Sequence, residues 1–266
     1  MKRKIPLIVL CVLFLGIAGV FGGKAYRTWK DHRSAELIRK DLAQYIQLEA
    51  VPADHGTPTP GAAAVKASAA QEPEEETPQI NWPVVDFEAL RKVNPDVVAW
   101  IYIEGTDLSY PVLQGEDNSY YLYRLLDGSD NIAGSIFLDY RSECDLSGRN
   151  SILYGHNMKN GSMFKMITYY KEQAFYDEHP RCMILTPDGN YLLEFFAGYV
   201  TDLNSQAWKM EFATDEEYAQ WLEEAVSQSV FTSGTVPSAQ DRVVTLSTCS
   251  YEFDNARFVL LGILKQ

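Results

Sequence analysis

A cysteine and an arginine stand at the two ends of the last hairpin that the sequence predicts. Cys249 ends the apolar, β-prone run "RVVTLSTC", and Arg257 opens the next such run, "RFVLLGIL". If the second run returns antiparallel to the first, Arg257 lies near Cys249, although the connection "SYEFDNA" leaves the register open. His156 follows a third such run, "NSILYG". We therefore ask what these three side chains could do together.

Cysteine, histidine and arginine are a sufficient set for acyl transfer at an amide. The thiolate of Cys249 attacks a carbonyl carbon, and a nearby cation favours that thiolate. The guanidinium of Arg257 donates to the oxyanion that develops, and the imidazole of His156 protonates the leaving amine. The alternative is structural, with a packed thiol, a turn histidine and a solvated arginine at a strand start.

The elements that must position these residues are mostly strands. Eight runs have the composition of short strands, namely residues 97–103, 108–113, 134–139, 150–155, 182–186, 191–200, 242–249 and 257–264. A short helix precedes Pro95, and helical patterns occupy 117–125, 162–178 with a break, and 214–228. This order predicts a mainly β fold, a closed or nearly closed eight-stranded barrel with helical insertions.

The first 23 residues predict a membrane anchor. Ile5 to Gly23 carries no charge, and at about 1.5 Å per residue this length roughly matches a hydrocarbon core of about 30 Å. A cleaved signal peptide is the alternative, but the run is longer than a typical signal core and no A-x-A site follows it. We expect an uncleaved transmembrane helix. Basic residues flank it on both sides, so charge alone does not orient it.

Three further segments follow the predicted anchor. Residues 24–50 predict a juxtamembrane helix, because Ile38, Leu42, Tyr45 and Ile46 recur at helical spacing. Residues 51–79 are rich in Pro, Ala, Thr and Glu and predict a disordered linker. We expect residues 80–266 to form one compact domain, the one that contains Cys249, His156 and Arg257.

Charge and cysteine content exclude several classes of protein. The chain of 266 residues has a formal net charge of -13, so no nucleic-acid partner is expected. Its four cysteines are no disulfide framework, and we expect Cys144 and Cys182 to be buried single thiols, with a Cys144–Cys182 disulfide as the alternative. His179 matches no motif and is expected at the surface. No phosphate loop and no metal-ligand spacing is present, so neither a cofactor nor a metal is expected.

The amino-acid sequences of several segments resemble those of the sortase family. "TLSTC", followed by Arg257 on the next strand, "LYGHNM", "GSIFLDYR" and "VVAWIYIEGTDLSYPVLQGEDNSYYL" are similar to sortase segments, most closely to those of class B. The resemblance runs from about residue 84 to the C-terminus. The acidic helix expected at 214–228 is similar to one that class B carries between two late strands.

The resemblance implies a mechanism and a location. Sortases are extracytoplasmic cysteine transpeptidases, mainly of Gram-positive bacteria, built on an eight-stranded barrel. By resemblance, Cys249 attacks the Thr carbonyl of a C-terminal sorting signal of the NPQTN or xPxTG type and forms a thioester. His156 is the general acid and base, and Arg257 stabilises the substrate carbonyl and the oxyanion. An amine, usually of a peptidoglycan precursor, resolves the thioester and anchors the surface protein to the cell wall.

Other implied features concern substrate binding and topology. Asn118 and Leu122 match a segment that lines the class B substrate groove, and Ser247 matches a small polar residue beside the signal peptide. For Leu122 the alternative is a helix residue that packs on the barrel. The resemblance orients the single-pass anchor with its N-terminus in the cytoplasm and the catalytic domain outside the cell. The expected partners are surface proteins with a sorting signal, a cell-wall amine and the membrane.

Three other functions remain open at this point. The same residues would serve a hydrolytic cysteine peptidase, because hydrolysis and transpeptidation share the acyl-enzyme. A pilin-polymerising sortase would use them to join pilin subunits. A membrane-tethered binding domain without enzymatic activity would need only a packed Cys249.

Overall fold

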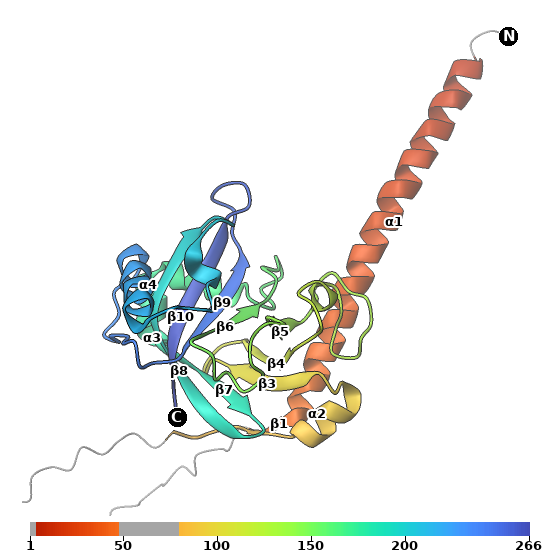
Figure 1. Ribbon diagram of the computed structural model, residues 1–266. Helices are drawn as coiled ribbons and strands as arrows, with labels where there is room; N and C mark the ends of the chain where they lie inside the picture. Colours follow the sequence, from red (N-terminus) through yellow and green to blue (C-terminus); the bar gives the residue numbers. More distant parts are fainter. Residues whose placement is uncertain (1–3, 48–79) are drawn as a thin grey trace, which may run out of the picture.

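The computed structural model describes residues 4–47 and 80–266, with the backbone alone for residues 4–20, 24 and 27. The part of the chain that it describes is a β-barrel with a long N-terminal helix beside it (Figure 1). The predicted linker at residues 51–79 lies outside the described residues.

The barrel consists of eight strands, in the positions that the sequence predicts. They are β3 (Val97–Tyr102), β4 (Ser109–Leu113), β5 (Ile136–Leu138), β6 (Asn150–Tyr154), β7 (Arg181–Thr186), β8 (Gly189–Thr201), β9 (Val243–Cys249) and β10 (Arg257–Lys265). The closed order is β10-β8-β7-β3-β4-β5-β6-β9. Two of the eight pairings, β4 with β5 and β6 with β9, are parallel, and the others are antiparallel. The prediction of a mainly β barrel is confirmed.

Two of the helices between the strands, α2 and α4, begin at side-chain caps. The carboxylate of Asp86 accepts from the Ala89 amide at 2.9 Å and starts α2 (Phe87–Val93). The Thr214 hydroxyl likewise accepts from the Glu217 amide at 3.1 Å and starts α4 (Asp215–Gln228), which buries Tyr218 and Leu222 against the outside of the barrel. The remaining short elements are η2 (Tyr120–Leu122), η3 (Met166–Lys171), α3 (Gln173–Glu178) and η4 (Gln206–Trp208).

The helix predicted at 117–125 is wrong: only the 3-10 turn η2 forms there. The carboxylate of Asp117 accepts from the backbone amides of Ser119 and Tyr120 at 2.7 and 2.8 Å, which winds a local turn. The carbonyl of Tyr121 accepts from the Ser135 amide, and that of Leu122 accepts from the His156 ring. These carbonyls are therefore engaged by distant parts of the chain and cannot extend a helix.

The N-terminal helix α1 (Lys4–Leu42) ends earlier than predicted. The chain continues through the 3-10 turn η1 (Ala43–Tyr45) into β1 (Ile46–Gln47), which pairs with β2 (Val84–Val85). The prediction of a helix from residue 24 to residue 50 is therefore wrong for residues 43–47, and residues 48–50 lie outside the described residues. Pairing with β2 draws residues 46 and 47 into the folded part of the chain.

The C-terminal half of α1 packs along the barrel on the side of β4 and β5 (Figure 1). Leu42 is buried, and Arg39 forms an ion pair with Asp107 at 3.5 Å. The buried amide of Asn131 donates to the Asp31 carbonyl and to the Ser34 hydroxyl, both at 2.8 Å. Residues 31–42 are thus part of the folded unit.

Among the helices whose side chains the structure describes, none is long and apolar enough to cross a membrane. The side chains of the predicted anchor at residues 1–23 lie almost entirely outside that description. The anchor stays a prediction.

Replacement of Asn131 by Ala should weaken the attachment of α1 to the barrel. It removes both hydrogen bonds to α1 and the one that the side-chain oxygen of Asn131, Oδ1, accepts from the Ala133 amide at 2.9 Å. We expect a loss of about 1–3 kcal/mol of stability, which lowers Tm by about 2–4 °C per kcal/mol in a domain of this size. Thermal unfolding of the full chain in detergent measures it. Asn204→Ala, at an exposed position, is the matched control, and equal Tm values for the two variants would contradict the assignment.

Candidate active site

Cys249 and Arg257 face each other across the last hairpin. In the antiparallel pairing of β9 with β10, the partner of Arg257 is Cys249. Directly opposite residues project from the same face of a sheet, with their Cβ atoms about 4.5–5.5 Å apart. The hairpin thus supplies the register that the sequence left open, and it sets the guanidinium beside the thiol.

His156 reaches the same end of the barrel from the other neighbour of β9. The parallel pairing of β6 with β9 matches Tyr154 to Ser247, and His156 and Cys249 each lie two residues further on. The residues around them are bonded together: the Thr248 hydroxyl donates to the Gly155 carbonyl at 2.7 Å, and the Asn157 amide donates to the Cys249 carbonyl at 2.7 Å. The loop that carries His156 is therefore fixed to the end of β9.

All six predicted site residues line one cavity of about 410 Å³. The predicted residues are Cys249, His156, Arg257, Asn118, Leu122 and Ser247, and the others that line the cavity are Phe137, Tyr154, Gly155, Leu203, Trp208 and Thr248. Cys249, His156 and Arg257 are each half-buried, so each remains accessible to a ligand in the cavity.

The imidazole of His156 is held by a backbone carbonyl. Its Nε2 lies 2.8 Å from the Leu122 oxygen. Because a carbonyl oxygen only accepts, Nε2 carries a hydrogen and donates it. Nδ1 is then the nitrogen that can exchange a proton with the thiol or with a leaving amine.

Gly134 makes this hydrogen bond possible. Its φ of +56° lies in the left-handed region that favours glycine. A Cβ atom at this position would lie 2.4 Å from the Leu122 oxygen, the same oxygen that accepts from His156. The close approach of these two backbone segments therefore requires glycine. Leu122 thus lines the cavity and also holds His156 in position with its carbonyl.

Arg257 uses part of its guanidinium to brace the loop before it. Nη1 donates to the carbonyls of Asn255 and Ala256 at 3.2 and 3.0 Å. Asn255 has a φ of +62°, a conformation that asparagine tolerates better than most residues. Within residues 4–47 and 80–266, no carboxylate lies at ion-pair distance from Arg257. Its remaining N–H groups are available to a developing oxyanion.

Trp208 forms a wall of the cavity that sequence reasoning missed. Its indole N–H donates to the Ser247 hydroxyl at 3.1 Å. The buried amide of Asn150 donates to the carbonyls of Ala207 and Lys209 at 3.2 and 2.9 Å and accepts from the Thr245 hydroxyl at 2.8 Å. Trp208 ends the short 3-10 turn η4 between β8 and α4, and a turn of this length has no periodicity that indicates which side chain turns inward.

The other thiols and histidines lie elsewhere. Cys182 is buried in β7, and burial raises the pKa of its thiol well above its ordinary value. Cys144 is a free and exposed thiol, so the prediction that it is buried is wrong: it lies on the surface loop between β5 and β6. No Cys144–Cys182 disulfide forms. His179 is half-buried at the end of α3, where its ring lies 4.7 Å from that of Phe175.

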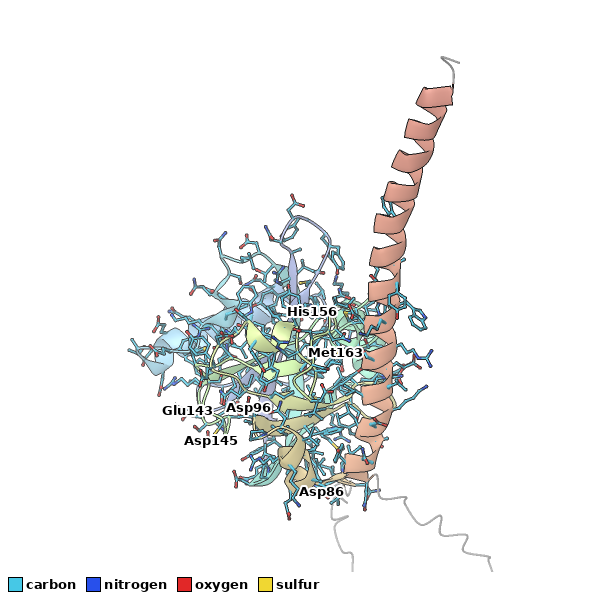
Figure 2. The ribbon with its side chains drawn as sticks, turned by 90° about the vertical axis from the view of Figure 1, so that its right-hand side faces the viewer. Asp86, Asp96, Glu143, Asp145, His156 and Met163 are labelled. Carbon is cyan, nitrogen blue, oxygen red and sulfur yellow. The ribbon has the colours of Figure 1, made fainter. Side chains whose placement is uncertain are left out.

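A larger cavity of about 620 Å³ lies between α1 and the barrel. Its lining includes Ile38, Arg39, Tyr110 and Met163, and Figure 2 shows Met163 beside α1. None of the six predicted site residues lines it. Among the described residues, no group of three or more His, Cys, Asp or Glu side chains could hold a metal ion. The chemistry therefore belongs to the smaller cavity, where a nucleophile, a proton carrier and an oxyanion donor meet.

Comparison with known proteins agrees with this geometry. The family model described as "Sortase domain" matches residues 101–264. The chain is 31% identical over 264 residues to sortase B of Staphylococcus aureus, with 98% of each chain covered. It is 38% identical over 191 residues to sortase B of Listeria monocytogenes, which covers 71% of this chain and 78% of the relative.

A solved structure shares the fold. The structure entitled "Staphylococcus aureus sortase B-substrate complex" superposes with a TM-score of 0.65 at 36% identity, covering 68% of this chain and 84% of the other. The family match spans most of the barrel, from β3 to β10, and includes Cys249, His156 and Arg257. The chain thus belongs to the sortase family of cysteine transpeptidases, and the relatives described above are sortases B.

Proposed function

We propose that the chain cleaves a C-terminal sorting signal after its threonine and transfers the surface protein to an amine of the cell wall. The observation that carries this proposal is the register that pairs Arg257 with Cys249 in the cavity that also contains His156. The Cys249 thiolate attacks the threonine carbonyl, and the Arg257 N–H groups stabilise the oxyanion. The C–N bond of the substrate breaks, and His156 gives its proton to the departing amine. A second amine then attacks the thioester, its proton passes to His156, and Cys249 is released.

We also propose that the first 23 residues anchor the protein with its N-terminus in the cytoplasm and its barrel outside. The uncharged run from Ile5 to Gly23 supports the anchor, and membership of the sortase family supports the orientation. In this arrangement the barrel meets surface proteins as they emerge from the membrane. The amine acceptor is then a peptidoglycan precursor or cross-bridge on the outer side.

Peptide cleavage tests the chemistry. Fluorogenic peptides with NPQTN, xPxTG or scrambled motifs are incubated with the full chain in detergent, with and without triglycine. We expect cleavage of one motif and, with triglycine, a product extended by the amine in mass spectrometry. Cys249→Ala should reduce kcat/KM by at least about 10³-fold, because the nucleophile is lost. Cys144→Ala is the control, since it removes an exposed thiol outside the cavity. Cleavage that persists in Cys249→Ala would rule out this mechanism.

Gly134→Ala should impair catalysis without touching the substrate. The new methyl group would press on the Leu122 oxygen and displace the hydrogen-bond partner of His156. A displacement of this kind costs about 10–100-fold in kcat/KM. Gly161→Ala is the matched control, because Gly161 also has a positive φ, +88°, but a Cβ there meets nothing within 4 Å. If both variants lose activity equally, the close contact between residue 134 and the Leu122 oxygen has no role in catalysis.

The exposed thiol of Cys144 reports on the location of the barrel. In a Cys249→Ala background, a membrane-impermeant maleimide added to intact Gram-positive cells should label the protein as fully as it does after lysis. Cys182 is buried and should stay unlabelled, and Cys144→Ser should abolish the signal. Labelling that appears only after lysis would place the barrel inside the cell and overturn the proposed orientation.

A further inference from the structure

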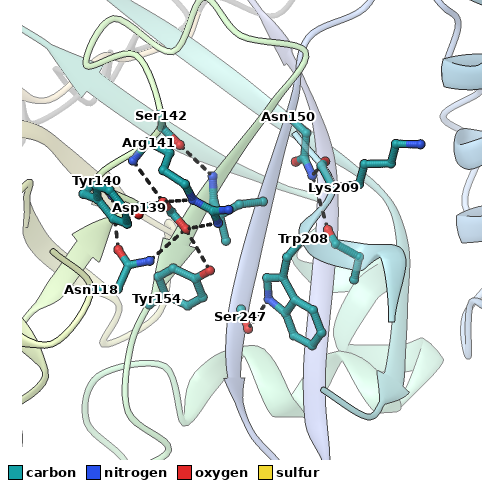
Figure 3. A network of polar contacts seen from close by, with 12 residues as sticks. Asn118, Asp139, Tyr140, Arg141, Ser142, Asn150, Tyr154, Trp208, Lys209 and Ser247 are labelled. Carbon is teal, nitrogen blue, oxygen red and sulfur yellow. Dashed lines mark hydrogen bonds and ion pairs between the residues drawn. The ribbon is translucent and has the colours of Figure 1, made fainter. Parts of the chain in front are cut away.

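A buried carboxylate lies directly behind the wall of the active-site cavity. Asp139 follows β5, and its side chain has no exposed surface. Its Oδ2 accepts from Asn118 Nδ2 at 2.9 Å, from the Tyr154 hydroxyl at 3.1 Å and from Arg141 Nη2 at 2.7 Å. Its Oδ1 accepts from Arg141 Nε at 2.9 Å and from the Arg141 amide at 3.0 Å. Figure 3 shows this network.

The carboxyl of Asp139 stays ionised at neutral pH. Burial raises its pKa, but the hydrogen bonds from Arg141 and Asn118 outweigh burial, so the pKa lies below its ordinary value. An ionised carboxylate only accepts hydrogen bonds. Each side chain that contacts it must therefore turn a hydrogen towards it. Since the pKa is lowered, the carboxylate stays ionised throughout the range in which an ordinary aspartate is ionised, and this state is lost only as the pH falls through the folded-state pKa.

This requirement fixes the orientation of two groups in the cavity wall. The Asn118 amide turns its NH₂ group to Asp139, while its oxygen accepts from the Tyr140 amide at 3.1 Å. The Tyr154 phenol uses its single hydrogen on Asp139. Burial, with the charge of Asp139 beside it, raises the pKa of Tyr154, so this hydrogen stays in place. Neither group can reverse its direction while Asp139 is charged.

The wall then offers one donor and one acceptor to a bound molecule. Asn118 has a second N–H and the Tyr154 oxygen has a lone pair, and both residues line the cavity. A carboxamide matches this pair, because its oxygen accepts and its nitrogen donates. A carboxylate of the same shape has no hydrogen for Tyr154 and meets an oxygen instead. Such a mismatch at a buried polar pair is costly.

We propose that Asp139 is a positioning residue that sets the hydrogen-bond polarity of this wall, and that the cavity thereby selects a carboxamide in the peptide over the isosteric carboxylate. The proposal rests on the proposed function, since the ligand is taken to be a sorting-signal peptide. Asp139 itself touches no substrate, because it does not line the cavity. It acts through Asn118 and Tyr154.

The test compares peptides that differ only in an amide or an acid. Each Asn or Gln of an NPQTN peptide is replaced in turn by Asp or Glu, and Kd is measured by fluorescence anisotropy on the full chain with Cys249→Ala, so that no turnover is needed. We expect at least one position at which the amide binds about 100-fold more tightly than the acid. Adding Asp139→Asn should reduce this preference about tenfold or more, because the Tyr154 hydroxyl is then free to donate to an acid.

Asp145→Asn is the matched control. Asp145 lies on the same loop as Asp139, and its carboxylate accepts from the Ser147 amide at 3.0 Å at an exposed position (Figure 2). It should leave the amide preference unchanged. Tyr154→Phe should reduce the preference with Asp139 intact, and it carries the test if Asp139→Asn does not fold.

The outcomes separate this role from a purely structural one. If Asp139 had only a structural role, its replacement would weaken the binding of amide and acid peptides by the same factor. An unchanged ratio of the two Kd values in Asp139→Asn or in Tyr154→Phe therefore overturns the proposal. Equal binding of amide and acid peptides by the parent protein does so as well. Because these readouts are binding constants, a failure of the cleavage assay bears on the proposed transpeptidase and not on Asp139.

Discussion

The active site depends on the register of strand β9 between its two neighbours. On one face of β9, Val244 and Leu246 belong to the main core inside the barrel. On the other face, Ser247 and Cys249 line the active-site cavity. Because side chains alternate along a strand, a slip of one residue would turn Cys249 towards the core and an apolar side chain towards the substrate. The apolar face thus fixes the position of the nucleophile.

The strands and the reacting residues could be predicted from the sequence because both leave local signals. Short β-prone runs separated by turn residues locate all eight strands, and Cys249, His156 and Arg257 each adjoin one of them. The pairing of Arg257 with Cys249 could not be predicted from spacing alone. A connection of this length permits several registers, and the choice is made by burial on β8 and β9 together, both of which pair with β10.

The residues that the sequence did not reveal act through contacts between distant segments. Asn150 holds the backbone around Trp208, and Asp139 orients Asn118 and Tyr154. A polar residue beside a strand usually faces solvent, so its type alone does not indicate a buried partner. The same cause accounts for the missing helix at 117–125. Helix propensity describes bonds within a segment, whereas the carbonyls of Tyr121 and Leu122 bond to Ser135 and His156.

The three reacting side chains differ in what holds them. Cys249 and Arg257 stand on paired strands of a closed barrel, whereas His156 lies past the end of β6 and depends on the Leu122 carbonyl. The segment around Leu122 is in turn fixed by the Asn131 amide, which donates to the Tyr123 carbonyl, and the Asn131 side chain bonds to α1. A chain of hydrogen bonds therefore leads from helix α1 through Asn131 to the segment that holds the proton carrier.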